Sequence, residues 1–299
     1  MANLKAIRKR ISTVKSTQKI TRAMKMVAGA RLNRAQQRIV ALRPYAQKVS
    51  DVLTEVVRAI GASGLEEAHP LLARRPEKKV LFLVISSDRG LCGAFNTNIN
   101  KRAEALWKAK VAEGIEVKFA TVGRRGRDYF RRRSAPSFQE FEGVWDELNL
   151  GQARRIAQSV LAPFLSGEVD AIYLIYNEFK SAMTQQVITR PLLPLAEMSA
   201  TASADEGHEG EPAPEYIFEP NQRSLFERLV PMYIEITLLR ALYDSVASEL
   251  GARMTAMDSA TKNAADMISS LTLRYNRQRQ AVITTELIEI IAGSEALQS

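Results

Sequence analysis

The turn Asp88–Gly93 is the first stretch of the sequence that could carry chemistry. It places two glycines directly after an apolar run, where nucleotide-binding proteins often hold a phosphate. The turn lacks the G-x-G-x-x-G spacing and the lysine of a G-x-x-x-x-G-K-[ST] loop, and Gly123–Gly126 is incomplete in the same way. These glycines are interpreted as tight strand-to-helix connections, and no direct nucleotide binding is expected.

Thiol and imidazole groups are scarce. The sequence contains one cysteine, Cys92, and two histidines, His69 and His208. A single thiol excludes an internal disulfide framework, and Cys–His catalysis or a metal site needs more ligands than these three residues supply. We therefore expect no catalytic residue, no metal and no cofactor.

The positive charge of the chain is concentrated at its N-terminal end. Residues 1–50 contain thirteen Lys or Arg and no acid, whereas the rest of the chain holds 29 basic and 33 acidic residues, a net charge of −4. A nucleic-acid-binding coiled-coil protein is one explanation, and its affinity would fall steeply with salt. However, no aromatic residue precedes Tyr45 and no zinc pattern is present. The charge favours a negatively charged partner surface.

These charges lie on a stretch with the pattern of a long helix. Apolar residues recur at heptad spacing from Leu4 to about Ile60, at Leu4, Ile7, Ile11, Val14, Ala28, Leu32, Ala35, Ile39 and Leu42. Gln18, Thr21 and Lys25 interrupt this line. Ile20, Met24 and Val27 are apolar one position away, so the pattern predicts that the buried stripe shifts locally at this level.

The C-terminal stretch from Met232 to Ala292 has the same repeat. Eight of ten residues at alternating spacings of three and four are apolar, in the line Leu250, Met254, Met257, Thr261, Ala264, Ile268, Leu271, Tyr275, Gln278 and Val282. A helix of this length is roughly 90 Å long and needs a partner along it. The last turns, with Leu287, Ile288, Ile290 and Ile291, are apolar around most of their circumference and should be buried in another protein.

Between these helices the sequence alternates strand and helix patterns. Residues 79–85, 115–122, 169–177, 185–195 and 216–218 are predicted as strands, and 99–112, 128–133 and 151–165 as helices. This order is typical of a small, largely parallel α/β layer. Residues 199–214 are acidic and proline-bearing and are expected to be mobile.

The predicted fold class is therefore α/β: an antiparallel coiled coil of long N- and C-terminal helices with an inserted Rossmann-like α/β domain. We expect an N-terminal coiled-coil helix over residues 1–64, the inserted domain over 65–220 and a C-terminal coiled-coil helix over 221–299. No apolar run reaches the length of about 18 residues that a membrane span needs.

Three separated motifs carry a family resemblance. Ser16–Ala28 (STQKITRAMKMVA), Asp88–Gly93 (DRGLCG) and Tyr275–Thr284 (YNRQRQAVIT), followed by Glu286 and Leu287, resemble the gamma subunit of the rotary F-type ATP synthase. The resemblance runs from end to end. The chain has no cysteine pair of the kind that gives chloroplast members redox control, which indicates a bacterial protein.

The resemblance implies a non-catalytic rotor shaft. Such a shaft turns inside a ring of alpha and beta subunits, contacts an epsilon subunit and rests on a membrane c-ring that is driven by protons. The implied location is peripheral, on the cytoplasmic face of the bacterial cell membrane. A small α/β enzyme remains a further alternative, and it would need a pocket with perturbed titratable groups.

The resemblance also implies contact residues. Met24 and Lys25 lie where the shaft meets the acidic lever of beta, and Arg279, Gln280, Thr284 and Glu286 match positions against the beta sleeve. Tyr216, Phe218 and Glu219 match the foot on the epsilon subunit and the membrane ring.

Overall fold

A computed structural model of the chain describes residues 4–60, 69–145, 147–195 and 222–298. It divides into two compact units, Met1–Gly29 with Arg253–Ser299, and Ala30–Ala252. The helices are α1 (Leu4–Ile60), the short 3-10 helix η1 (Pro70–Leu72), α3 (Phe95–Ala112), α4 (Arg124–Arg131), α5 (Leu150–Leu165) and α7 (Gln222–Gln298). The strands are β1 (Lys79–Ile85), β2 (Glu116–Val122), β3 (Ser137–Phe141), β4 (Ala171–Phe179) and β5 (Gln185–Leu193).

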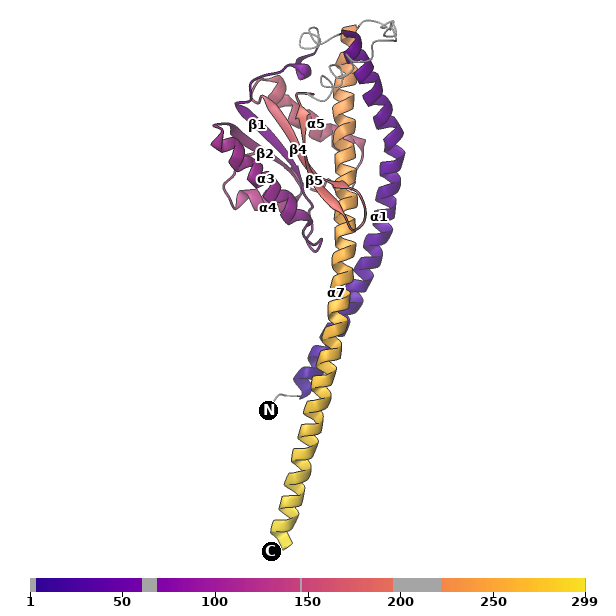
Figure 1. The fold of residues 1–299 in the computed structure, drawn as a ribbon, viewed down its shortest axis with the longest axis vertical. Helices are drawn as coiled ribbons and strands as arrows, with labels where there is room; N and C mark the ends of the chain where they lie inside the picture. Colours follow the sequence, from indigo (N-terminus) through magenta and orange to yellow (C-terminus); the bar gives the residue numbers. More distant parts are fainter. Residues whose placement is uncertain (1–3, 61–68, 146, 196–221, 299) are drawn as a thin grey trace, which may run out of the picture. The chain divides into compact units, whose positions relative to one another are not determined.

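The second unit holds a five-stranded sheet in the order β3-β2-β1-β4-β5 (Figure 1). The first four strands are parallel, and β5 pairs antiparallel with β4 at one edge. Pro191 lies in β5, where a missing backbone N–H is tolerated because the strand has a neighbour on one side alone. The predicted, largely parallel α/β layer is confirmed.

Alternate side chains of β1 pack into two different cores. Val80, Phe82 and Val84 join Ile99 of α3 and Phe130 of α4 in one cluster. Leu81, Leu83 and Ile85 join the other cluster, which includes residues of α5 and of the first turns of α7. Because both faces are covered, the strand is a continuous apolar run without alternation, as the sequence suggested.

The two long helices pair antiparallel within each unit. In the second unit Leu32 and Ala35 of α1 form a cluster with Ala247 and Leu250 of α7. In the first unit Arg8 pairs with Tyr275 and Lys25 with Asp258. Residue numbers rise along α1 while those of their partners on α7 fall, so the two helices are antiparallel. Among the described residues, no helix is both long enough and apolar enough to cross a membrane.

Several elements differ from the sequence patterns. Helix α7 runs from Gln222 through Pro231 to Gln298, close to the predicted bounds 221–299, whereas other elements deviate more. Helix α4 covers Arg124–Arg131, earlier than the predicted 128–133. Strand β3 was not predicted, because a single one of its five residues is buried and it shows no alternating pattern. The strand predicted at 216–218 and the acidic stretch 199–214 lie outside the described residues.

Candidate functional site

The paired helices of the first unit carry the predicted beta-contact residues. The seam of α7 follows the predicted line, with Met257, Ala264 and Leu271 buried at its centre. On α1, the residues turned toward the seam keep the heptad spacing without a shift from Leu4 to Ala28. The predicted local shift of the stripe is wrong. Thr21 is 9% exposed, whereas Ile20 and Val27 are 59% and 54% exposed.

Polar partners on α7 explain why the stripe does not shift. The hydroxyls of Thr21 and Thr261 lie 2.8 Å apart, and the Lys25 ammonium donates to the Asp258 carboxylate at 2.5 Å. Lys262 donates to the second oxygen of Asp258 at 3.0 Å. These two lysines lower the pKa of Asp258, with the hydrogen bond from Lys25 as the largest cause. Sequence reasoning missed Asp258, although its spacing of four residues before Lys262 is typical of a helical ion pair.

Met24 and Lys25 form one group of predicted contact residues. Met24 is partly exposed beside the exposed Ile20 and Val27, so an apolar strip lies outside the seam at this level. The Lys25 side chain points partly toward α7 and forms an ion pair with Asp258.

Arg279, Gln280, Thr284 and Glu286 form a second group on the last turns of α7, and all four are exposed. The Thr284 hydroxyl donates to the backbone carbonyl of Gln280. This group lies 21 residues beyond the level of Asp258, or about 32 Å along a helix, so the structure does not bring the two groups together.

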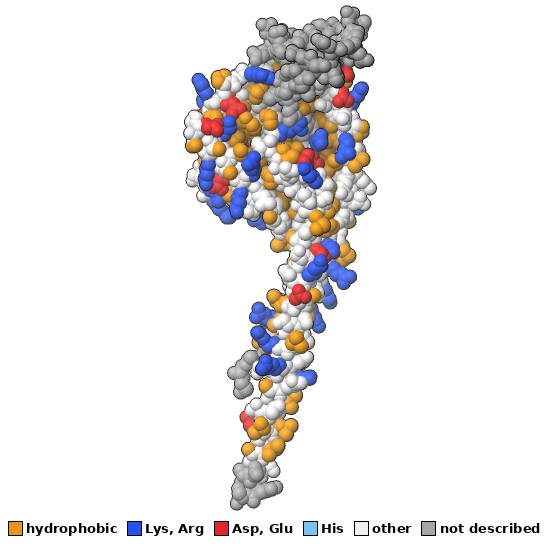
Figure 2. Space-filling model, viewed as in Figure 1, with side chains coloured by type: hydrophobic (Ala, Val, Ile, Leu, Met, Phe, Trp, Pro, Cys, Tyr) orange, Lys and Arg blue, Asp and Glu red, His pale blue; other side chains and the backbone are white. Residues whose placement is uncertain are grey.

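The end of α7 is a single apolar helix. Within the first unit its last turns run past the N-terminus of α1 (Figure 1). Its large apolar side chains are 49% to 72% exposed, at Ile283, Leu287, Ile288, Ile290 and Ile291. Figure 2 shows hydrophobic side chains toward the C-terminal end and Lys and Arg side chains along the helices before it.

The predicted foot residues Tyr216, Phe218 and Glu219 lie outside the described residues. His208 lies outside them as well.

The turn after β1 uses its polar groups to bind its own neighbours. The Ser86 hydroxyl accepts from the Gly126 backbone N–H at 2.8 Å, and Asp88 accepts from the Arg124 N–H at 2.9 Å. The buried Cys92 thiol lies 3.1 Å from the Asn96 amide nitrogen. These bonds tie the turn after β1 to α3 and α4. The turn needs glycines because φ is +56° at Gly93 and a Cβ on Gly90 would lie 2.8 Å from the Arg125 guanidinium.

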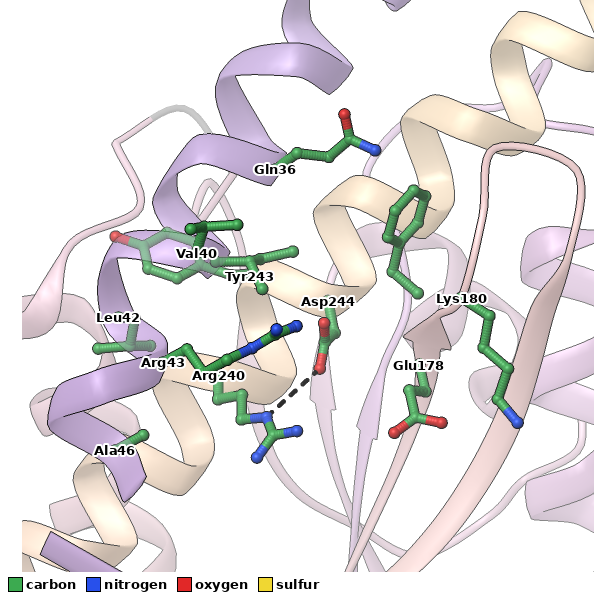
Figure 3. A pocket seen from close by; sticks show the side chains of 12 residues that line it. Gln36, Val40, Leu42, Arg43, Ala46, Glu178, Lys180, Arg240, Tyr243 and Asp244 are labelled. Atoms are coloured by element: carbon green, nitrogen blue, oxygen red, sulfur yellow. Dashed lines mark ion pairs between the residues drawn. The ribbon is translucent and has the colours of Figure 1, made fainter. Parts of the chain in front are cut away.

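A cavity of about 590 Å³ lies in the second unit between α1, α7 and the β4–β5 hairpin. Figure 3 shows Arg43 of α1 and Arg240 of α7 on one side of Asp244, and Glu178 and Lys180 of the hairpin on the other side. The Arg240 Nε lies 3.9 Å from the Asp244 carboxylate, which is too long for a hydrogen bond. Burial raises the pKa of Asp244 to about 6, the Glu178 carboxylate adds to this rise, and Arg240 and Arg43 oppose it.

The cavity is lined by two carboxylates, Glu178 and Asp244, by three basic side chains and by Tyr243, with no Ser, Thr, Cys or His among its lining residues. A carboxylate with a raised pKa is what the alternative of a small α/β enzyme requires, and the similarity to known proteins reported below decides between the two functions. Within the described ranges, no three His, Cys, Asp or Glu side chains are grouped as metal ligands. Two exposed apolar surfaces remain without cover in the described residues and are the candidate binding surfaces. They are the strip of Ile20, Met24 and Val27 on α1 and the end of α7.

The family model of ATP synthase matches residues 3–297 of the chain. The ATP synthase gamma chain of Sorangium cellulosum is 58% identical over 322 aligned residues, which cover 100% of both chains. That of Geotalea uraniireducens is 46% identical over 298 residues, again with 100% of both chains covered. No comparison supports a nucleic-acid-binding protein.

Solved structures share the fold. A chain of the central stalk and c-ring of the Tetrahymena thermophila mitochondrial ATP synthase has a TM-score of 0.61 at 26% identity and covers 81% of this chain and 99% of its own. A chain of the Euglena gracilis mitochondrial ATP synthase has a TM-score of 0.67 at 19% identity and covers 98% and 94%. The resemblance found in the three sequence motifs is confirmed: this chain belongs to the family of ATP synthase gamma chains.

Proposed function

We propose that this chain is the central rotor shaft of a rotary F-type ATP synthase. It couples proton flow through a membrane c-ring to ATP synthesis or hydrolysis at the beta-subunit sites, and it catalyses no reaction itself. The observation that carries this proposal is an antiparallel helix pair from which one helix continues alone with an exposed apolar end, in a chain that matches gamma chains over its whole length.

Two sets of residues would meet the beta subunits. Met24 and Lys25 would lie at the acidic lever of beta. Arg279 and Gln280, with Thr284 and Glu286, would lie against the sleeve that surrounds the end of α7. The helices of the first unit are rich in Lys and Arg, so acidic groups of the ring are attracted to them at every rotor angle.

The other assignments follow from the rotor function. Tyr216, Phe218 and Glu219 would form the foot on the epsilon subunit and the c-ring. The coiled-coil segments 1–64 and 221–299 would act as the shaft and 65–220 as the domain inserted between them. The complex would place the chain on the cytoplasmic face of a bacterial membrane, as a peripheral subunit.

Co-purification with alpha and beta subunits, followed by a rotation assay, tests this function. The Lys108 side chain is 72% exposed and Cys92 is buried, so a Lys108→Cys chain can carry a probe at one position. With the beta subunits fixed to a surface, the probe should rotate when ATP is added. Steady ATP hydrolysis with a stationary probe would contradict the rotor function.

A further inference from the structure

For two heptads, the seam positions that α1 contributes change from apolar to polar residues. Gln18, Thr21 and Lys25 occupy seam positions between the apolar Val14 and Ala28. In the same turns the apolar side chains of Ile20 and Val27 point away from α7, as their exposure shows. Burial of apolar area alone would favour the opposite arrangement, with these side chains in the seam. Another interaction must hold the helix in this orientation.

Helix α7 supplies that interaction at both levels. Thr21 meets Thr261 at 2.8 Å, and Lys25 meets Asp258 at 2.5 Å. Because the Asp258 carboxylate also accepts from Lys262, both of its oxygens are engaged.

The sequence of α7 offers these partners in one register. A slip of one heptad would bring Thr21 opposite Met254 or Ile268 instead of Thr261. The same slip would bring the Lys25 ammonium opposite Gly251 or Ala265 instead of Asp258. After such a slip Thr21 would keep its hydrogen bond to the Gln18 carbonyl, and Lys25, whose side chain is 43% exposed, would remain solvated. What the slip would lose is the Thr21–Thr261 contact and the Lys25–Asp258 ion pair, and matched polar pairs of this kind specify register in coiled coils.

We propose that Asp258 is a positioning residue of the rotor, and that with Thr261 it sets the axial register of α1 against α7. The register pairs the partly exposed Lys25 with Asp258 and turns Met24, with Ile20 and Val27, toward the surrounding ring. Met24 then makes the contact with beta, and Lys25 acts through Asp258. This inference rests on the proposed rotor function and deepens it.

The test uses the complete membrane complex with Asp258→Lys, Lys25→Asp and the double variant that exchanges the two charges. We expect each single variant to lower ATP-driven proton pumping per ATP hydrolysed by roughly fivefold, because like charges meet in the seam. The exchange should restore the ratio to within about twofold, because opposite charges again face each other across the seam. It should not restore the ratio fully, because the lysine introduced at position 258 repels Lys262 four residues away.

The matched control is Asp266→Lys. Asp266 is exposed on the same helix, so the same change of charge occurs outside the seam. This variant should leave the pumping ratio unchanged.

A cross-link reports the register independently of catalysis. Thr21→Cys with Thr261→Cys should form a disulfide, since the two hydroxyls lie 2.8 Å apart, whereas Thr21→Cys with Ile268→Cys reports a slip of one heptad. Adding Asp258→Lys should lower the first yield and raise the second.

Three outcomes would overturn the proposal. They are an exchange variant that pumps as poorly as the single variants, an Asp266→Lys control that loses as much coupling, or cross-link yields that Asp258→Lys leaves unchanged. Failure of the rotor function would be distinguishable, because the unaltered chain would then not copurify with alpha and beta.

Discussion

Asp244 is a buried carboxylate that receives no hydrogen bond in the part of the chain that the structure describes. It is 5% exposed and faces the cavity shown in Figure 3, with Arg240 at 3.9 Å. Its pKa rises from 3.8 to about 6, chiefly because burial disfavours the charged form. The folded chain therefore binds this proton more tightly than the unfolded chain does.

Asp244→Asn should remove a pH dependence of stability. In the wild type, protonated Asp244 contributes on the order of 2–3 kcal/mol to the free energy of unfolding. This contribution is fully present below pH 3.8 and is lost as the pH rises through about 6. We expect the variant to be more stable than wild type at pH 7.5 and to differ little at pH 4, as measured by urea unfolding of the isolated chain. The exposed Asp266→Asn serves as control, and equal effects of Asp244→Asn at both pH values would refute the expectation.

Arg279 and Gln280 lie on an exposed face of α7 and take no part in the described seam. If the guanidinium gives two parallel hydrogen bonds to a carboxylate of beta, its loss removes roughly 1.5–3 kcal/mol, or ten- to hundredfold in rate at the limiting rotor angle. Arg279→Ala with Gln280→Leu should assemble normally and hydrolyse ATP slowly. Arg277→Ala, which removes the same charge from a different side of the helix, should retain its turnover. Unchanged turnover of the double variant would rule out the contact.

At the scale of elements, Gly123 connects β2 to α4. Its φ is +94°, and a Cβ there would lie 2.5 Å from the Ser86 backbone oxygen. Gly123→Ala should destabilise the second unit by on the order of 3 kcal/mol, because backbone strain and a clash with backbone act together. Gly114→Ala, at φ +79° with open space around it, isolates the strain and should cost about 1 kcal/mol. Thermal unfolding of both variants checks the difference, and equal losses would exclude the clash as a cause.

The elements that could be predicted are those with many buried residues. Strand β1 was predicted at its observed bounds because all but one of its residues are buried, and the seam of α7 follows its apolar repeat. Strand β3 could not be predicted, since pairing with β2 and not its own side chains makes it a strand. The polar middle of the α1 seam could not be predicted from α1 alone, because Thr21 and Lys25 depend on partners more than 230 residues away.

The contact residues were predicted from a family resemblance, and the chain by itself shows two of their properties. It shows that Met24 is partly exposed and that Arg279 and Gln280 are free of the described seam. Their partners stay a prediction from the resemblance, because a contact with another subunit leaves no pattern in the sequence of this chain. The role of Asp258 required the geometry of both helices.

At the scale of the whole molecule, the end of α7 predicts self-association of the isolated chain. Its exposed large side chains from Ile283 to Ile291 form an apolar surface with no cover in the described chain. Sedimentation velocity should show association that grows with concentration. Ile288→Glu with Ile291→Lys should weaken it, whereas Val111→Glu, at an isolated exposed position of α3, should not. A concentration-independent monomer would contradict this expectation.

The polar contacts of the seam join residues that are synthesised at very different times. Lys25 leaves the ribosome 233 residues before Asp258, which at the usual rates of synthesis is roughly 10–50 s. During that interval the basic helix is present without its partner, while the strands β1 to β4 and the helices between them can already assemble. Contacts this distant in sequence are the slowest to form. The seam at Lys25 therefore cannot close until synthesis has passed Asp258, so the register that Asp258 selects is set late in the production of the chain.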